Sequence, residues 1–153
     1  QLAVVEYARN VCNMKNAHST EFDKKTPYPV IDFIPDQIKI LQESRYGATM
    51  RLGAYPAILK KGSLVSKLSG EEKVFERHRH RYEVNPTYVE ELEKCGMVFS
   101  GRSPDGVLMD FMELPSHPYF VGTQAHPEFK SRPMKPSPLF DGLIKTARKK
   151  KGL

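Results

Sequence analysis

His126 and Glu128 stand two residues apart at the end of a predicted apolar strand, in the stretch GTQAHPEFKSRP. In extended backbone, residues i and i+2 project to the same face, so the glutamate can accept a hydrogen bond from one imidazole nitrogen while the other nitrogen faces a substrate. Pro127 stiffens the turn between them. A histidine held in this way has a fixed tautomer and can move protons for a thiol or hydroxyl nucleophile and an amine leaving group. A surface histidine that happens to lie near a glutamate would give the same short pattern.

Four segments, taken in order along the chain, make a more specific pattern than this pair alone. They are NAHSTEFD (residues 16–23), GATMRLGAYP (47–56), ERHRHRYEVNP (76–86) and HPEF (126–129). In this order they resemble the amidotransferase domain of the CTP synthase family, and HPE is shared by class I glutamine amidotransferases in general. The resemblance reaches from Gln1 to about Leu143. It implies a partial glutamine amidotransferase domain over residues 1–144, followed by a basic tail over residues 145–153.

The fold class that the resemblance implies is α/β, a layered open sheet with flanking helices of the flavodoxin-like, three-layer kind. Alternating helix and strand patterns along the sequence favour the same class. A chain of 153 residues without internal repeats has the size of one domain with its own core.

The activity that the resemblance implies is hydrolysis of glutamine by a Cys-His-Glu triad. A cysteine thiolate attacks the side-chain amide, His126 protonates the departing ammonia and then activates water, and Glu128 orients His126. The ammonia passes to an ATP-dependent synthase domain of the same enzyme, which converts UTP to CTP. For the full enzyme the resemblance also implies magnesium with the ATP, GTP as an allosteric activator, and a homotetramer. No cofactor or metal site is expected in this chain itself.

Three residues are expected to bind glutamine because they align with the family's substrate contacts. Arg81 would hold the α-carboxylate and Glu21 the α-ammonium, and Gln1 aligns with a further contact. Arg77 and Arg79 share the face of Arg81 on the same predicted strand. An error of two residues in register would therefore transfer the α-carboxylate contact from Arg81 to a neighbouring arginine. Taken without the resemblance, the arginines are a solvated or salt-bridged strand face, and Glu21 is a loop or capping carboxylate.

The nucleophile is expected outside this sequence. In the family it sits in an elbow of the form GxCLGMQ, whose last glutamine aligns with Gln1, so the chain is predicted to be a domain fragment that is inactive alone. Cys12 lies on the apolar side of a predicted helix, and Cys95 lies beside Gly96 at the end of another. Buried apolar thiols are usually inert, so neither cysteine suits the role.

Charge and composition bear on the other function classes. The formal net charge is +6, and much of it lies in residues 145–151, where a solvated tail or a helix C-terminus accounts for it without a nucleic-acid partner. The sequence has no apolar run of membrane-spanning length, and its two cysteines form no CxxC pair, which favours a reducing compartment, the cytoplasm. His78 and His80 have no further ligands at metal spacing, so no metal site is expected there.

Hydrophobic periodicity and turn residues predict the elements. The chain opens with a helix expected to pack through Leu2, Val5, Ala8 and Val11 or Cys12. A last helix begins at Ser137 and Pro138 and has Leu139, Phe140, Leu143, Ile144 and Ala147 on one side. The remaining predictions are strands at 30–34, at 50–59 near a sheet edge or bent because of Pro56, and at 76–84, 97–100, 107–114 and 119–124; turns at 60–62, 69–72 and 103–106; and a helix at 87–94, started by Asn85 and Pro86 and stopped by Gly96.

Two alternatives stay open at the level of the sequence. The nearer one is another class I amidotransferase, of the GMP synthase or anthranilate synthase type, against which the RHRHRYEV and STEF segments argue. The other is a non-catalytic basic binding module in which HPE is structural. Glutaminase activity in a protein extended upstream of Gln1 distinguishes the enzyme from the module.

Overall fold

The structure is a computed structural model that describes residues 1–33 and 50–152. The chain divides into two compact units, a first unit of Gln1–Leu52 and Arg79–Gly96 and a second unit of Gly53–His78 and Met97–Leu153. Helices and strands occur in both units, so the predicted α/β class is confirmed. Ile34, the predicted end of a strand, and residues 36–46, which the sequence pattern left unassigned, lie outside the described residues.

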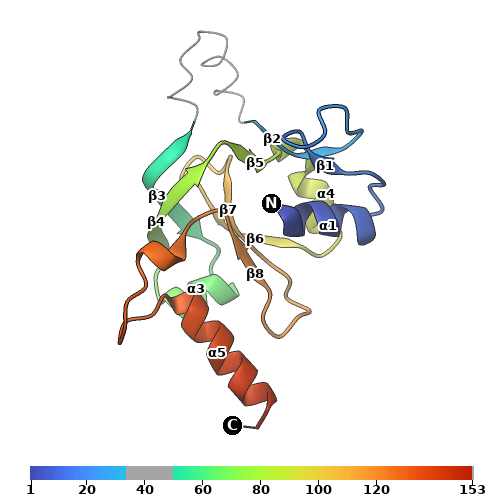
Figure 1. The fold of residues 1–153 in the computed structure, drawn as a ribbon. Helices are drawn as coiled ribbons and strands as arrows, with labels where there is room; N and C mark the ends of the chain where they lie inside the picture. The colour runs from blue at the N-terminus through green and yellow to red at the C-terminus, as the bar shows by residue number, and fades with distance from the viewer. Residues whose placement is uncertain (34–49, 153) are drawn as a thin grey trace. The chain divides into compact units, whose positions relative to one another are not determined.

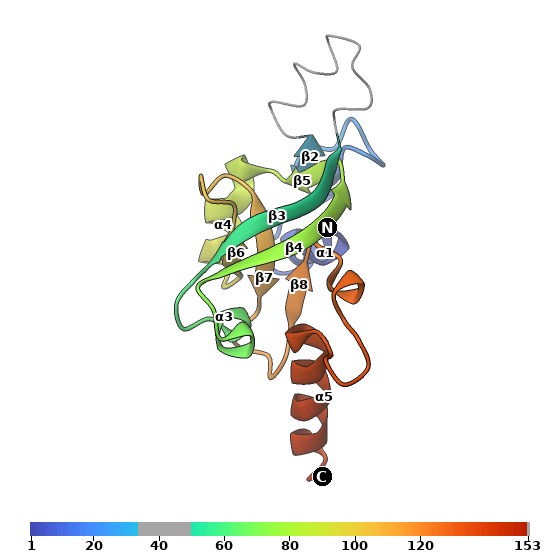
Figure 2. The ribbon, with the colours of Figure 1, turned by 90° about the vertical axis from the view of Figure 1, so that its left-hand side faces the viewer.

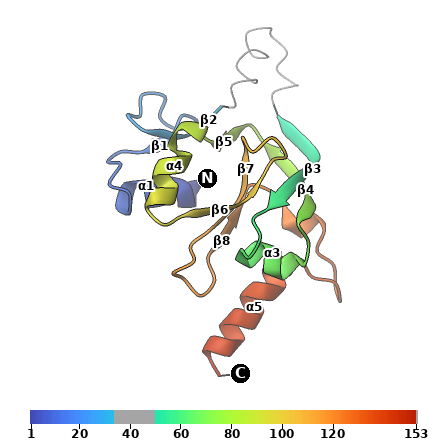
Figure 3. The ribbon, with the colours of Figure 1, turned by 180° about the vertical axis from the view of Figure 1, so that it is seen from behind.

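In its described residues, the first unit contains the helices α1 (Leu2–Asn10) and α4 (Val89–Lys94) and a small sheet (Figure 3). The sheet has the order β1-β2-β5, in which β1 (His18–Ser19) runs parallel to β2 (Pro29–Phe33), and β5 (Tyr82–Val84) pairs antiparallel with β2. Helix α1 reaches the end of α4. This contact is a hydrogen bond in which the Tyr7 hydroxyl donates to the Cys95 carbonyl at 2.7 Å.

The start of α4 follows the prediction from the sequence. The Asn85 side chain accepts a hydrogen bond from the backbone N–H of Thr87 at 3.0 Å, which is the role of a helix cap. The same side chain donates to the Pro29 carbonyl at 2.9 Å and so ties the cap to β2. The first turn is a 3-10 helix, η2 (Pro86–Tyr88), before the α-helix begins.

Helix α1 packs through a face that overlaps the predicted one in part. Its buried residues are Val4, Val5, Tyr7 and Ala8, whereas Leu2 is 71% exposed and Val11 is 47% exposed. Val5 and Ala8 were assigned correctly. Periodicity alone missed Tyr7, because a buried tyrosine usually needs a hydrogen-bond partner for its hydroxyl, and here that acceptor is the distant Cys95 carbonyl.

The second unit is built on a sheet of order β4-β3-β6-β7-β8, in which β6, β7 and β8 pair antiparallel with their neighbours. Figure 2 shows β3 and β4 as long adjacent strands. Ala57, Leu59, Val65 and Phe111 form a buried hydrophobic cluster in this unit. The elements are β3 (Arg51–Leu59), α3 (Leu64–Ser69), β4 (Lys73–His80), β6 (Val98–Arg102), β7 (Met109–Glu113), β8 (Val121–Thr123), η3 (Pro127–Phe129) and α5 (Pro138–Lys150).

The strands of this unit match the predicted ones with shifted ends. The predicted strand 50–59 is β3, which lies between β4 and β6, next to the sheet edge. Within the described residues it pairs with β6 through Ile58 and Leu59, so Pro56, which has no N–H to donate, lies outside that pairing. The turn between β6 and β7 is the predicted one, held by the Ser103 hydroxyl, which bonds Asp105 and accepts from Leu108 N at 2.9 Å.

The single strand predicted for residues 76–84 is wrong. The chain forms β4 up to His80 and resumes as β5 at Tyr82, and the two strands belong to different sheets. The residue between them is Arg81, so the three arginines do not share one strand face.

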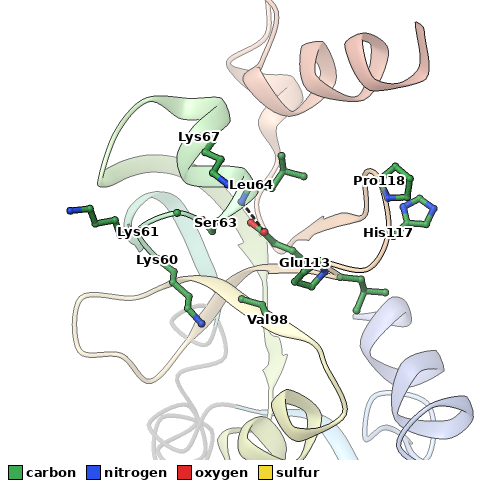
Figure 4. A pocket seen from close by; sticks show the side chains of 12 residues that line it. Lys60, Lys61, Ser63, Leu64, Lys67, Val98, Glu113, His117 and Pro118 are labelled. Atoms are coloured by element: carbon green, nitrogen blue, oxygen red, sulfur yellow. Dashed lines mark hydrogen bonds between the residues drawn. The ribbon is translucent and has the colours of Figure 1, made fainter. Parts of the chain in front are cut away.

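Helix α3 was not predicted, and a buried carboxylate explains where it begins (Figure 4). Glu113, at the end of β7, is 5% exposed. Its two carboxylate oxygens accept hydrogen bonds from the backbone N–H groups of Leu64 and Val65, both at 2.9 Å. Ser63 caps the same end by accepting from Ser66 N at 3.1 Å. Because the first N–H groups of a helix lack partners within the helix, this carboxylate stabilises the turn from outside it.

Helix α5 is the predicted last helix, and few of its apolar residues are buried. It contacts the rest of its unit through Gly142, which is buried, and through Leu139, which packs on the core. The expected apolar side is largely exposed, including Phe140, Leu143 and Ile144. The helix runs on to Lys150 and thus includes most of the basic residues assigned to a tail. Within residues 1–33 and 50–152, no helix combines the length and the apolar character needed to cross a bilayer.

We predict that Glu113→Ala lowers the free energy of unfolding by about 1–3 kcal/mol, since it leaves buried N–H donors of α3 unpaired. Glu113→Gln retains one acceptor oxygen and should lose less. Urea denaturation checks both, with Glu90→Ala as a control because the Glu90 side chain is 82% exposed. Equal midpoints for Glu113→Ala and Glu90→Ala would contradict the role given to Glu113.

Candidate active site

His126 and Glu128 form a short hydrogen bond in the second unit. His126 precedes the 3-10 helix η3, Glu128 lies inside it, and His126 Nδ1 is 2.7 Å from Glu128 Oε1. The predicted contact is therefore present, but the backbone is a 3-10 turn and not an extended strand. An ionised carboxylate only accepts hydrogen bonds, so Nδ1 carries the proton and Nε2 is left as the basic nitrogen. This is the tautomer that a general base requires.

Strand β4 anchors the segment that carries this pair. The backbone N–H of His126 donates to the carbonyl of Arg77 at 2.8 Å. Lys130, just after η3, donates from Nζ to the Phe75 carbonyl at 2.6 Å and to Glu76 Oε1 at 2.9 Å. Both ends of η3 are thus tied to three consecutive residues of β4. The sequence carries no signal for these ties, because they join residues about fifty positions apart.

The histidine and the glutamate remain accessible. The exposed fractions of their side chains are 38% for His126 and 53% for Glu128. The ring of Phe129 lies 5.3 Å from the imidazole between centroids. The hydrogen bond with His126 lowers the pKa of the Glu128 carboxyl from its ordinary value, so the carboxylate stays ionised at neutral pH.

The three residues expected to bind glutamine line one hollow in the first unit, of about 410 Å³. Gln1, Glu21 and Arg81 contribute to it from α1's start, the β1–β2 loop and the β4–β5 junction. A volume of this size suits an amino acid. Sequence reasoning did not single out the other lining residues, which are Phe33, Met50, Arg79, His80 and Tyr82.

Charges of both signs line this hollow. Glu21 is exposed, and Arg81 is half-buried. The Nε atom of Arg81 is buried and makes no hydrogen bond within the described residues. A buried donor without a partner is costly, so it fits a site in which a ligand supplies the acceptor. Gln1 is held in place by its Nε2 group, which donates to the Tyr82 carbonyl at 3.0 Å.

A buried charge cluster lies at the junction of β4 and β5, next to Arg79 and Arg81 in the sequence. Glu83 is 2% exposed and lies 3.6 Å from the Arg51 guanidinium and 3.3 Å from His80 Nδ1. His80 also lines the hollow. Neither Arg51 nor Glu83 was identified from the sequence. The only signal in the sequence was an acidic residue, Glu83, that follows the alternating arginine and histidine run after one tyrosine.

His78, by contrast, is part of the interior of the second unit. Its Nε2 lies 3.7 Å from Asp110 Oδ1, and both side chains are fully buried. Tyr55 meets its ring edge to face at a centroid distance of 5.9 Å. No group of three or more metal-ligating side chains occurs in the part of the chain that the structure describes.

Cys12 and Cys95 are distant in sequence from His126 and Glu128, and Cys12 is also chemically unsuited to be the nucleophile. Burial, reinforced by the neighbouring Cys95 thiol, raises the pKa of the Cys12 thiol to about 12. A thiol with so high a pKa is protonated at neutral pH and is a poor nucleophile.

A second hollow, of about 390 Å³, lies in the second unit between the turn before α3 and the β7–β8 loop (Figure 4). Lys60, Lys61 and Lys67 stand on one side of it and His117 on the other. Figure 4 shows Lys61 pointing away from the hollow, and the carboxylate of Glu113 is bonded to α3. These cations do not converge on one point, so this hollow lacks the geometry of an anion site.

The structure therefore groups the expected site residues in two sets, each within its own unit. Gln1, Glu21 and Arg81 line the amino-acid-sized hollow of the first unit. His126 and Glu128 form the hydrogen-bonded pair of the second unit. Arg77 belongs to the second unit, whereas Arg79 and Arg81 both line the hollow. The arginine expected to hold the α-carboxylate is therefore one of Arg79 and Arg81.

Comparison with known families defines the class of protein that carries these features. The chain belongs to the family described as glutamine amidotransferase class-I, whose model matches residues 1–146. It is 61% identical over 153 residues to a CTP synthase of Methanococcus aeolicus, covering 99% of the chain and 28% of that protein. It is 59% identical over 147 residues to a CTP synthase of Methanocaldococcus jannaschii, covering 96% and 27%. The chain thus spans little more than a quarter of the length of these relatives.

A solved structure agrees with this assignment. The glutaminase domain of Trypanosoma brucei CTPS with bound acivicin superimposes with a TM-score of 0.86 at 35% sequence identity. The match covers 97% of this chain and 57% of the other.

We predict that His126→Ala raises the pKa of Glu128 back towards 4.5, because the hydrogen bond with His126 is the main cause of its lowering. A carboxyl whose folded-state pKa is lowered stabilises the fold above its unfolded pKa, and that effect is lost as the pH falls through the folded pKa. Carboxyl NMR titration measures the shift. Glu90 is the control, since Lys94 lowers its pKa independently. An unchanged pKa of Glu128 in this variant would rule out the hydrogen bond with His126 as the cause of the lowering.

Proposed function

We propose that this chain forms part of the glutaminase domain of a CTP synthase, which hydrolyses glutamine and uses the ammonia for the ATP-dependent amination of UTP. The observation that carries the proposal is the 2.7 Å hydrogen bond between His126 and Glu128 in a class I amidotransferase chain. Relatives named CTP synthase, at 59–61% identity, favour this over a GMP synthase or anthranilate synthase type. A binding module without catalysis has no use for a base with a fixed tautomer.

His126 acts twice in the proposed reaction. A thiolate attacks the side-chain carbonyl of glutamine, and the protonated imidazole gives its Nε2 proton to the amide nitrogen as the carbon–nitrogen bond breaks and ammonia leaves. The same Nε2 then takes a proton from water, which attacks the thioester and releases glutamate and the thiolate. Glu128 holds the ring through Nδ1 and stabilises its charged form.

The hollow of the first unit supplies substrate recognition in this proposal. Arg81 pairs with the α-carboxylate and supplies it with the buried Nε donor, while Glu21 pairs with the α-ammonium. Gln1 adds an amide whose Nε2 is already engaged by Tyr82, which leaves its carbonyl oxygen as an acceptor. Two charges of opposite sign select a zwitterionic amino acid over a simple amide.

The attacking thiol comes from polypeptide outside this chain in our proposal. Cys12 is unsuited because its thiol pKa is about 12. The ATP, magnesium and UTP chemistry is assigned to a synthase domain, and GTP activation and a homotetramer to the whole enzyme. These assignments rest on the similarity to CTP synthases. The two free cysteines, Cys12 and Cys95, suit a reducing compartment, and we place the enzyme in the cytoplasm.

His126→Ala in the natural full-length protein should abolish CTP formation with glutamine and leave CTP formation with ammonia largely intact, because free ammonia bypasses the triad. Glu128→Gln should be milder, since it removes an orienting group and not the base. Conversion of UTP to CTP, followed by absorbance with each nitrogen source, tests both. Loss of both activities to the same extent in His126→Ala would indicate a folding role and refute the proposal.

Arg81→Met and Glu21→Gln should each raise the KM for glutamine strongly, with a loss on the order of 2–5 kcal/mol where the pair is desolvated. Ammonia-dependent turnover should be unchanged. Methionine keeps much of the arginine stem, so the loss of packing is limited. Arg79→Met is the matched control from the same hollow. A defect in Arg79→Met with normal glutamine kinetics in Arg81→Met would show that the carboxylate contact is Arg79.

A further inference from the structure

Two buried side chains join strands that are not neighbours in the sheet of the second unit. His78 lies on β4 and Asp110 lies on β7, and β3 and β6 stand between these strands in the strand order. In a flat sheet, strands three steps apart lie about 14 Å from each other. His78 Nε2 is nevertheless 3.7 Å from Asp110 Oδ1, because the sheet is curled and brings β4 towards β7 (Figures 1 and 2).

The segment that leads into His126 spans the same two strands. On the β7 side, the backbone N–H of Gln124 donates to the Asp110 carbonyl at 3.1 Å, and the Thr123 hydroxyl donates to that carbonyl at 3.0 Å. On the β4 side, the backbone N–H of His126 donates to the Arg77 carbonyl at 2.8 Å. The two N–H groups are two residues apart, so at most about 7 Å separates them. Both bonds therefore form only while β4 and β7 keep a narrow range of separation.

The side-chain contact and these backbone bonds share their ends. The Arg77 carbonyl belongs to the peptide group that joins Arg77 to His78. The Asp110 carbonyl belongs to the residue whose carboxylate faces His78. The contacts thus close a ring, which runs from β4 through the two side chains to β7 and returns to β4 through residues 124–126. A shift of β4 against β7 would strain or break the bond that holds the His126 backbone.

Burial makes the contact between His78 and Asp110, the His78–Asp110 link, resistant to such a shift. Both side chains are fully buried, and a buried carboxylate is strongly destabilised when its partner is taken away. The ring of Tyr55, on β3, meets the imidazole edge to face at a centroid distance of 5.9 Å. The side chain of His126, by contrast, is 38% exposed. Its orientation therefore depends more on its backbone attachment than on its own packing.

We propose that His78 and Asp110 are positioning residues for His126 in glutamine hydrolysis. Their link fixes β4 against β7, and this spacing fixes the backbone from which the imidazole reaches the substrate. The inference deepens the proposed function and rests on it, since it takes His126 as the general acid and base. Neither residue touches the substrate, so their loss acts through orientation alone. A misplacement of about 1 Å at a catalytic group can lower a rate about a hundredfold.

The kinetics of Asp110→Asn in the natural full-length protein test this role. The variant should lower kcat for glutamine-dependent CTP formation at least about tenfold and change the KM for glutamine less than about twofold. Ammonia-dependent turnover should be retained. Glu113→Gln is the matched control, because Glu113 is also a buried carboxylate of β7 but bonds α3. An unchanged kcat in Asp110→Asn, or an equal loss of kcat in Glu113→Gln, would overturn the proposal.

Two substitutions of His78 separate positioning from the filling of the core. A glutamine side chain can place its amide nitrogen where the imidazole Nε2 lies, whereas asparagine reaches only as far as Nδ1. His78→Gln should therefore keep kcat with glutamine within about threefold, and His78→Asn should lower it about tenfold or more. Equal values in the two variants would contradict a link through Nε2. This pair carries the test if Asp110→Asn fails to fold, which loss of ammonia-dependent turnover would reveal.

Hydrogen exchange, followed by mass spectrometry with peptide fragmentation, tests the link without turnover. In Asp110→Asn the backbone N–H of His126 should exchange about ten times faster, and that of Val65 should not change. Glu113→Gln should have the opposite effect, because Glu113 accepts from Val65 N. Unchanged exchange at His126 in an active Asp110→Asn enzyme would overturn the link alone. Faster exchange there in a natural protein without glutaminase activity would instead refute the proposed function, and with it the catalytic role of the link.

Discussion

The hydrogen bond from the His126 backbone N–H to the Arg77 carbonyl is the constraint on which the candidate site depends. It holds the residue before η3 against β4, and the Lys130 side chain holds the residue after it against Phe75 and Glu76. With both ends fixed, the tight 3-10 turn brings Glu128 back onto His126, and the imidazole has one orientation and one tautomer. A base on a free loop would lose this orientation, and orientation is what a catalytic histidine contributes beyond its pKa.

The buried acids of the chain follow a common rule. Glu83 lies beside Arg51 and His80, Asp110 lies beside His78, and the carboxylate of Glu113 accepts two backbone N–H groups. Each is 5% exposed or less, and each has a specific compensating group. A buried carboxylate without such a group would be too costly, so these contacts fix where β5, β7 and α3 lie. Exposed pairs such as Lys94 with Glu90 contribute little by comparison.

The errors of the sequence-based predictions share one cause, which is that a pattern shows which residues are apolar but not which neighbours they meet. Helix α1 buries Tyr7 because a carbonyl is within reach of its hydroxyl, and it leaves Leu2 exposed. Helix α5 buries Gly142, a residue with no hydrophobic signal, while Phe140, Leu143 and Ile144 are exposed. The break at Arg81 has the same origin, since β4 and β5 find partners in different sheets.

Local chemistry determined much of this protein from the sequence alone. The HPEF spacing predicted the contact between His126 and Glu128, Asn85 and Pro86 predicted the start of the helix at residues 86–94, and the order of four segments identified the family. These features need only residues close together in the chain. Tertiary structure decided the rest: the grouping of Gln1, Glu21 and Arg81 around one hollow, the choice of Arg79 over Arg77 as Arg81's neighbour there, and the anchoring of η3 to β4. Each of these joins residues tens of positions apart, and only the packing of strands and helices brings such residues within a few ångströms of one another.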